Sequence, residues 1–198
     1  IYNGVAVVTN PGAKGKGTLV VLNDEIHYAR NVVKTNTTSV QTFVSINRGP
    51  AGVVNTGKIQ WFEPMDRKVG PATGFSVDAL DKLPRVDVIY AHANMSADLI
   101  DAAIKNGAKG LVIAGVGDGN MTTPALDAVT RAAKSGIVVV RSTRLASGIT
   151  LRNNEVNDDE KGLVASGELN PAKSRVLLQL ALTKTNDPVQ IQKMFYEY

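Results

Sequence analysis

The sequence predicts an α/β protein, and three observations support this. From residue 84 onward apolar strands alternate with helical segments, which is typical of parallel sheets with right-handed crossovers. One of these strands, Leu111–Ala114, has no polar alternation, so we expect it to be covered on both faces. Residues 1–62 are rich in strands, and the Pro-, Gly- and charge-rich stretch 63–83 indicates an interdomain linker. The remaining residues, 84–198, are expected to form a C-terminal α/β domain with a parallel sheet.

The first segment begins as if a helix were already under way. Ile1, Val5 and Val8 recur at helical spacing, and no capping residue precedes them, so we expect this chain to be a piece of a longer protein. Strands are expected over 18–22 and 26–33, separated by a turn, and a hairpin is expected around Asn55-Thr56-Gly57.

Helix boundaries in the C-terminal segment follow from capping residues. We expect strands at 86–90, 111–114 and 137–140. We expect a helix at 97–105, capped by Ser96 and ended by Gly107, and a second one capped by Thr122 or Thr123, with Pro124 in its first position and Gly136 after its end. A third helix is expected from the Asn170 cap to about Thr183, and a last short helix is expected to begin at Asp187.

Composition excludes several function classes. The net charge is +4 and the pI about 9.3, but Lys and Arg are scattered without a basic helix face, which argues against nucleic-acid binding. No apolar run reaches the length of a membrane span. The absence of cysteine excludes disulfides and thiolate chemistry, and the two histidines, His27 and His92, have no partner at ligand spacing, so we expect no metal site.

A glycine-rich turn follows the buried strand. Gly115, Gly117 and Gly119 stand at alternate positions before Asn120, at the strand end where α/β proteins usually bind ligands. The spacing differs from a dinucleotide fingerprint, which needs a two-residue gap before its third glycine. The turn is therefore either a tight strand-to-helix connection or a place where the Asn120 amide reaches a ligand.

Two further segments could carry chemistry. Lys34 precedes a Thr-rich turn and would serve as a proton shuttle if burial lowered its pKa; the alternative is a solvated lysine. The polar loop 152–161 carries several carboxylates, one of which could bind a cationic group; the alternative is a solvated acidic loop.

Together these segments resemble type II bacterial L-asparaginases over the whole chain. The resemblance rests on Lys34–Thr38, Ala114–Asn120, Val140–Arg144, Leu169–Leu178 and the ending Ile191–Tyr198. It implies an amidohydrolase that splits asparagine, and often glutamine, to the acid and ammonia, with a threonine nucleophile and no cofactor. It also implies a flavodoxin-like, Rossmann-like C-terminal domain.

The family's two threonine motifs, Thr-Gly-Gly-Thr-Ile-Ala and His-Gly-Thr-Asp-Thr, are absent from this sequence. Both normally precede the point where the chain starts. The resemblance therefore implies that 1–62 is the remainder of a larger N-terminal catalytic domain, and that residues 1–198 alone are inactive.

The resemblance also assigns site residues. The family's catalytic lysine falls on Lys34, and its asparagine after the glycine turn and its polar-loop glutamate fall on Asn120 and Glu155. The last two normally reach the neighbouring subunit's site, with Glu155 near the substrate's α-ammonium. Asp118 departs from the pattern, since many relatives carry Asn or another uncharged residue there.

The partners implied are L-asparagine or L-glutamine, the N-terminal part of the same protein, and further copies in a homotetramer built as a dimer of dimers. The resemblance implies a periplasmic location; a cytoplasmic location is the alternative, because this sequence shows no signal peptide. The alternative from a different class is a non-catalytic, two-lobed α/β small-molecule binding module. That alternative explains the glycine turn and linker but not the coincidence of the lysine, asparagine and glutamate motifs.

Overall fold

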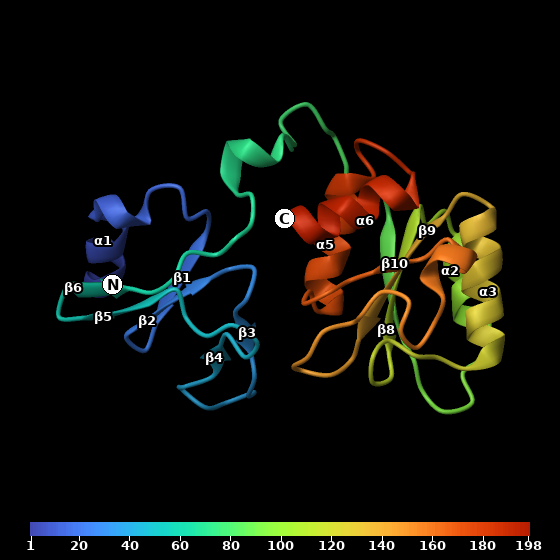
Figure 1. Cartoon of the computed structure of the whole chain (residues 1–198), viewed down its shortest axis with the longest axis horizontal. Helices are drawn as coiled ribbons and strands as arrows, with labels where there is room; N and C mark the ends of the chain where they lie inside the picture. Colours follow the sequence, from blue (N-terminus) through green and yellow to red (C-terminus); the bar gives the residue numbers. More distant parts are fainter. The chain divides into compact units, whose positions relative to one another are not determined.

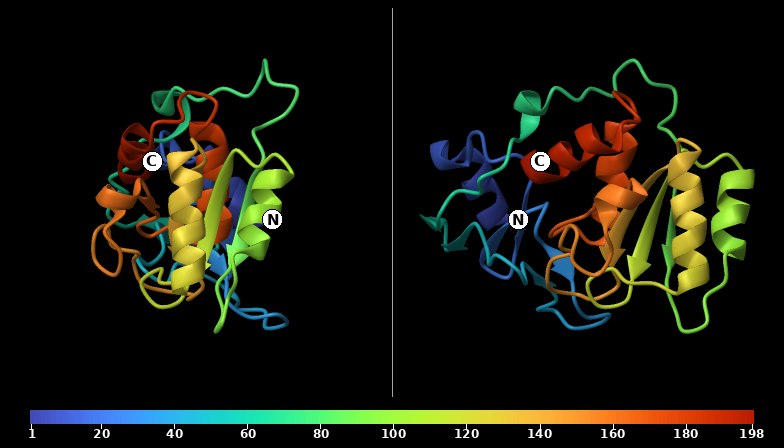
Figure 2. Two further views of the ribbon diagram at one scale, coloured as in Figure 1. Left: turned by 90° about the vertical axis from the view of Figure 1, so that its right-hand side faces the viewer. Right: turned by 45° about the vertical axis from the view of Figure 1, so that its right-hand side comes forward.

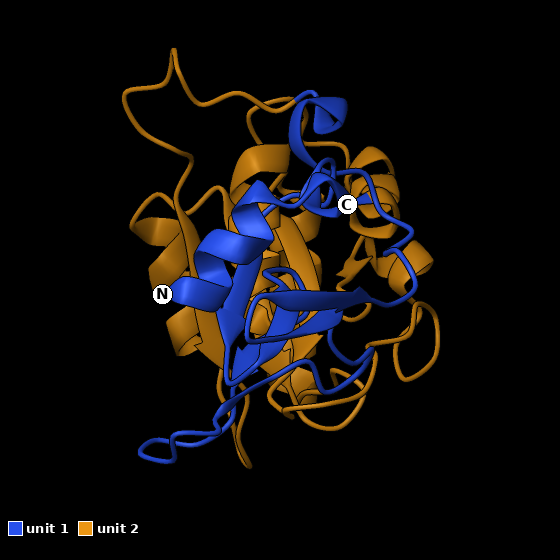
Figure 3. Cartoon of the chain, turned by 90° about the vertical axis from the view of Figure 1, so that its left-hand side faces the viewer, with its two compact units in different colours: residues 1–74, 198 blue, residues 75–197 orange.

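The computed structural model describes all 198 residues and divides them into two compact units. One unit comprises 1–74 together with Tyr198, and the other comprises 75–197 (Figure 3). No helix combines the length and the apolar composition that crossing a membrane would require. The expected α/β class is confirmed, because an antiparallel sheet and a parallel sheet are both present together with helices.

The N-terminal unit is built on a four-stranded antiparallel sheet of order β1-β2-β5-β6 (Figure 1). A separate two-stranded antiparallel ribbon joins β3 and β4. Buried residues of α1, β2 and β5, among them Val7, Ile26 and Val54, form its core. Its elements are α1 (Tyr2–Thr9), the 3-10 turn Pro11–Ala13, β1 (Leu19–Leu22), β2 (Glu25–Tyr28), β3 (Val33–Lys34), β4 (Phe43–Val44), β5 (Gly52–Asn55), β6 (Lys58–Trp61) and the 3-10 turn Gly70–Thr73.

The expected helix at the start and the hairpin between β5 and β6 are confirmed. The hairpin turns through Thr56 and Gly57, whose φ values of 48° and 81° suit a two-residue turn between twisted strands. The turn between β1 and β2 contains Asp24, whose carboxylate accepts hydrogen bonds from the amides of Asn3 and Asn55, both at 2.9 Å. These contacts join α1 to both hairpins.

The single strand expected over 26–33 is wrong, because β2 ends at Tyr28. The Tyr28 carbonyl accepts hydrogen bonds from the N–H groups of Asn31 and Val32, which turns the chain before β3 begins at Val33. β3 then pairs with β4. The sequence did not predict β4, because the apolar pair Phe43–Val44 is too short to indicate a strand.

The C-terminal unit contains a four-stranded parallel sheet of order β10-β9-β8-β7 (Figure 1). All six residues of both β8 and β9 are buried, as expected for central strands covered on both faces. Its elements are β7 (Val86–Tyr90), α2 (Asp98–Lys105), β8 (Gly110–Gly115), α3 (Thr123–Lys134), β9 (Val138–Thr143), α4 (Asp158–Lys161), β10 (Val164–Ala165), α5 (Pro171–Ala181) and α6 (Pro188–Glu197).

Helices cover both faces of this sheet (Figures 1 and 2). On one face Leu111, Ile113 and Val139 pack with α2 and α3 in the main core cluster. On the other face α5 lies close to the sheet, because a Cβ at Gly110 would meet the Leu178 side chain at 2.7 Å. The sheet is thus the middle of three layers, with helices packed on both of its faces. The loops that follow the strands lie at its carboxyl edge.

Most helix signals are confirmed. The Thr122 hydroxyl caps α3 by accepting from the Ala125 N–H, and Gly136 follows its end with a φ of +89°. Asn170 caps α5 in the same way, at the Lys173 N–H. The predicted Ser96 cap is wrong: α2 begins at Asp98, its N-cap residue is Ala97, and no side chain caps it. The Ser96 hydroxyl instead accepts from the Asp98 N–H at 3.3 Å, in the turn that leads into the helix.

A buried histidine in the N-terminal unit links β2 to the residue after β4. The Nδ1 atom of His27 lies 2.9 Å from the Ser45 hydroxyl, and its Nε2 atom lies 3.3 Å from the Glu25 carboxylate. Both His27 and Ser45 are buried. Burial lowers the pKa of His27 below 6.5 and outweighs Glu25, which raises it.

This lowered pKa predicts a pH dependence of stability. Because the unfolded chain binds the His27 proton more readily, the stabilising contribution is complete above pH 6.5 and is lost as the pH falls through the folded-state pKa. In the full-length protein, His27→Gln should reduce the loss of melting temperature between about pH 7.5 and pH 5. The exposed His92 provides the control substitution, His92→Gln. Parallel pH curves for wild type and His27→Gln would contradict the assignment.

Candidate active site

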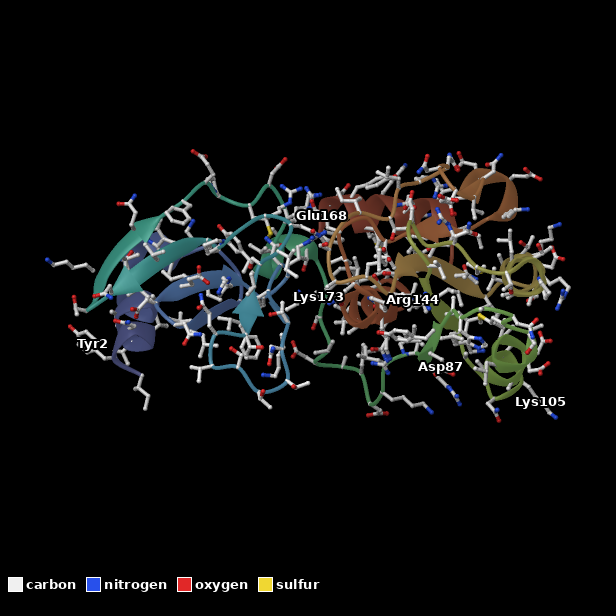
Figure 4. All side chains as sticks on the ribbon, turned by 90° about the horizontal axis from the view of Figure 1, so that it is seen from below. Tyr2, Asp87, Lys105, Arg144, Glu168 and Lys173 are labelled. Carbon is white, nitrogen blue, oxygen red and sulfur yellow. The ribbon has the colours of Figure 1, made fainter.

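The carboxyl ends of the parallel strands are joined by hydrogen bonds from the backbone and the side chain of Arg144. Arg144, labelled in Figure 4, directly follows β9. Its N–H donates to the Gly115 carbonyl at the end of β8, and its Nη1 donates to the Ala91 carbonyl beyond β7 at 2.8 Å. The loops that carry the candidate residues therefore start from a fixed edge.

The glycine-rich turn closes tightly after β8. Val116 and Asn120 exchange two backbone hydrogen bonds of 2.8 Å. A Cβ on Gly115 would collide with the backbone of Gly119, so only glycine allows this approach. Gly119 has a φ of +78°, and a Cβ there would lie 2.9 Å from Nη1 of Arg141. The turn thus places Asn120 at a defined position beside a buried arginine.

Arg141 and Asp158 form a fully buried ion pair. Nε of Arg141 donates to Oδ1 of Asp158 at 2.6 Å, and Nη2 donates to Oδ2 at 2.8 Å. The remaining guanidinium protons reach the backbone carbonyls of Asp118 at 2.8 Å and Leu151 at 3.0 Å. One side chain therefore binds the glycine turn, the polar loop and α4 to the central strand β9.

Further contacts fix the polar loop from residue 150 to 157. The Asn153 N–H donates to Oδ2 of Asp158 at 2.9 Å. Arg152 donates to the Leu163 carbonyl and to the Gln192 side chain of α6, and it pairs with Asp159. The loop is thus ordered by polar contacts.

Part of this loop is helical, although Glu155, Asp159 and Glu160 are exposed, as the alternative of a solvated acidic loop predicts. Asp158–Lys161 forms α4, and the Asn157 side chain caps it by accepting from the Glu160 N–H at 3.2 Å. The pKa of the Asp159 carboxyl is lowered, first by the hydrogen bond from Asn153 and second by the one from Arg152. Only Asp158 in this acidic run is buried.

Asn120 and Glu155 lie side by side. Nδ2 of Asn120 donates to Oε2 of Glu155 at 3.2 Å, and Oδ1 of Asn120 accepts from the Met121 N–H at 2.7 Å. The second bond fixes the orientation of the amide, so its NH₂ group faces the carboxylate. Glu155 is exposed, and its Oε1 atom has no partner in the chain. An anchored carboxylate with a free oxygen is suited to binding a cationic ligand group.

Lys34 lies in the N-terminal unit, at the end of the β3–β4 ribbon. It is exposed, and its Nζ atom lies 5.3 Å from the ring centre of its cross-strand neighbour Phe43. The Thr-rich turn that follows is ordered, since Thr42 and Asn36 exchange hydrogen bonds of 2.8 Å and 2.6 Å. Nζ makes no hydrogen bond or ion pair within the chain and is available to another group.

No group of three or more His, Cys, Asp or Glu side chains has the geometry to hold a metal ion. The candidate groups are instead an amide and a carboxylate in the C-terminal unit and a lysine in the N-terminal unit. The chain is thus an α/β protein whose C-terminal unit presents polar groups beyond the carboxyl ends of a parallel sheet.

Comparison with known proteins identifies the family. The family model described as "Asparaginase, N-terminal" matches residues 1–67, and the one described as "Glutaminase/Asparaginase C-terminal domain" matches residues 85–195. The chain therefore belongs to the glutaminase/asparaginase family, and the resemblance seen in the sequence is confirmed.

Several curated relatives align with the whole of this chain. L-asparaginase 2 of Bacillus subtilis is 50% identical over 198 residues, which cover 52% of that protein. Probable L-asparaginase periplasmic of Haemophilus influenzae is 46% identical, with 57% of it covered, and glutaminase-asparaginase of Pseudomonas fluorescens is 37% identical, with 55% covered. The chain spans little more than half the length of these relatives.

The buried ion pair predicts the energetics of the site. Asp158→Ala leaves the Arg141 charge buried without its partner and should lower the free energy of unfolding by about 3–5 kcal/mol. The double variant Arg141→Leu/Asp158→Ala should lose less than the sum of the two single variants, because no unpaired charge remains. Chemical denaturation of the full-length protein measures both effects.

The neighbouring, exposed Asp159 is the matched control, and Asp159→Ala should change stability little. An equal loss for Asp158→Ala and Asp159→Ala would contradict the structural role assigned to the buried pair.

Proposed function

We propose that the full-length protein hydrolyses L-asparagine, and L-glutamine as a second substrate, to the corresponding acid and ammonia. The observation that carries the proposal is the Asn120–Glu155 pair, held beyond the carboxyl ends of β8 and β9 in a member of the asparaginase family. The names of relatives 37–50% identical over the whole chain support the substrates.

Each residue has a distinct role in this proposal. Glu155 binds the α-ammonium of the substrate, and Asn120 holds the Glu155 carboxylate. A threonine hydroxyl, which the family resemblance places in motifs outside residues 1–198, attacks the amide carbonyl. Lys34 assists removal of the hydroxyl proton; the C–N bond breaks, the departing NH₂ group takes up that proton and leaves as ammonia, and water hydrolyses the acyl-enzyme to the acid and the free threonine hydroxyl. No step in this scheme calls for a cofactor.

We further propose that Asn120 and Glu155 complete the site of a neighbouring subunit in a homotetramer. Four large apolar side chains are exposed on the loops that carry or adjoin these residues, which is typical of a protein contact surface. They are Val116, Leu145, Ile149 and Leu151. Contact with a second copy would bury them and bring Glu155 to a ligand bound by that copy.

The domain organisation and the location are also proposals. A linker over 63–83 would join the remainder of the catalytic domain to the C-terminal domain; this stretch carries only the short turn Gly70–Thr73. A periplasmic location is supported by the name of the Haemophilus influenzae relative, probable L-asparaginase periplasmic.

Ammonia release by the full-length protein from asparagine and glutamine tests the central proposal. Turnover at about 1 s⁻¹ or faster supports the hydrolase. Tight binding of either amino acid without any ammonia release would instead support the two-lobed binding module.

Lys34 should affect the chemical step more than binding. In the full-length enzyme, Lys34→Ala should lower kcat by roughly 10²-fold or more, because general acid–base assistance contributes on that scale. Its melting temperature should stay near that of wild type, since the Lys34 side chain is exposed. Lys58→Ala, at an exposed lysine of β6, is the control. A kcat within two- to threefold of wild type would show that Lys34 is only a solvated residue.

Sharing of Glu155 between subunits is tested by mixing an impaired variant with an inactive one. Glu155→Ala should reduce kcat/KM by about 1.5–3 kcal/mol, the scale of a charge-assisted hydrogen bond. A hybrid of Glu155→Ala subunits with subunits lacking the nucleophile should regain activity, because one of its sites combines an intact nucleophile with an intact borrowed glutamate. If each subunit used its own Glu155, every hybrid site would stay damaged and mixing would restore nothing.

A further inference from the structure

A second side-chain link joins the glycine turn to the polar loop. Oδ1 of Asp118 accepts from the Leu151 N–H at 2.6 Å, and Oδ2 accepts from Nδ2 of Asn154 at 2.7 Å. Asn154 directly precedes Glu155 in the chain. The turn therefore contacts the loop twice: Asp118 binds Asn154, and Asn120 binds Glu155.

Asp118 is itself held on a rigid support. Its backbone carbonyl accepts from Nη1 of Arg141 at 2.8 Å, and Arg141 is fully buried in its pair with Asp158. The Asp118 carboxylate thus connects the exposed part of the polar loop to the buried pair of Arg141 and Asp158. Glu155, by contrast, is exposed and has one hydrogen bond of its own.

We propose that Asp118 is a positioning residue that holds the loop at the Leu151 N–H and at the Asn154 side chain, so that the Glu155 carboxylate is prepared to bind the substrate's α-ammonium. This rests on the proposed function, in which Glu155 contacts that ammonium. An exposed glutamate without this support samples several orientations, and ordering it on binding weakens affinity. The negative charge of Asp118 also favours a cation at this edge of the domain.

The ammonium is present both in the bound substrate and in the transition state. Support for Glu155 therefore contributes uniform binding, and its loss should raise KM more than it lowers kcat. The effect should also be specific for ligands that carry an ammonium group.

An asparagine at position 118 should preserve the link. Its Oδ1 can accept from the Leu151 N–H, and its NH₂ can donate to Oδ1 of Asn154 once that exposed amide turns over. Asp118→Asn should thus restore most of what Asp118→Ala loses, apart from the contribution of the charge.

The test compares two ligands in the full-length protein. L-Aspartate, the product, carries the α-ammonium, and succinate has the same two carboxylates without it. Asp118→Ala should raise the KM for asparagine and the dissociation constant of aspartate about tenfold and leave succinate within about twofold, as expected for lost ground-state binding to one group. Asp118→Asn should stay within about threefold of wild type for aspartate.

Two further variants sharpen the test. Asn154→Ala removes one of the two contacts without altering Asp118, so it should weaken aspartate binding in the same direction if Asp118→Ala folds poorly. Asp127→Ala, at an exposed carboxylate on α3, is the matched control. In a Glu155→Ala background, Asp118→Ala should weaken aspartate binding by no more than about threefold, because the group that it positions is gone and only the contribution of its charge remains.

The outcomes separate the two proposals. Unchanged aspartate binding in both Asp118→Ala and Asn154→Ala, or an equal loss for succinate and aspartate, overturns the positioning role. Absence of turnover in the wild-type enzyme overturns the proposed function, and aspartate binding measured by calorimetry still decides the role of Asp118.

Discussion

The buried ion pair between Arg141 and Asp158 is the interaction on which the candidate site depends. Neither side chain is exposed, and both oxygens of the carboxylate are used. Burying two charges is costly, and mutual attraction offsets that cost only when the geometry is good and the remaining protons are satisfied. Here they are satisfied by backbone carbonyls of the glycine turn and the polar loop. The same bonds that make the charge tolerable inside the domain thus position the segments that carry Asn120 and Glu155.

This arrangement explains how loops with few apolar residues can hold a defined shape. The central strands are covered by helices on both faces, so their carboxyl ends are fixed. Beyond that edge, hydrogen bonds fix each segment against the next. Arg141 donates to the Asp118 carbonyl, and the Asp118 carboxylate accepts from Asn154. Asn120 donates to Glu155. Gly115 and Gly119 are required because the turn packs against its own backbone and against the arginine. The outermost member of the series, Glu155, is the exposed one.

Local signals in the sequence predicted much of the fold. The continuous apolar runs at 111–114 and 137–140, the Thr122 and Asn170 caps and the turn at Thr56–Gly57 depend on neighbouring residues alone, and all are present. The short strands β4 and β10 depend on pairing with other segments, so local patterns did not reveal them. The break after Tyr28 is a local turn, closed by the N–H groups of Asn31 and Val32, and the prediction of one strand over 26–33 missed it. Asn120 was singled out by the glycine turn at the end of a buried strand and by family resemblance, and Glu155 by family resemblance alone. Arg141 was missed as the organising residue, although a charge following Val138–Val140 in a buried strand signals a need for a partner. Asp158 could not be told from Asp159 and Glu160, because only the fold decides which of them is buried.

The central claim is that this chain of polar contacts presents Glu155 to the ammonium of an amino-acid ligand. A crystal structure of the full-length protein with bound L-aspartate tests it most directly. The account predicts an oxygen of Glu155 within about 3 Å of the ligand nitrogen, the usual hydrogen-bond range, with the bonds from Asn120 to Glu155 and from Arg141 to Asp158 retained. A ligand nitrogen bound by other groups, with Glu155 turned to solvent, would contradict the account.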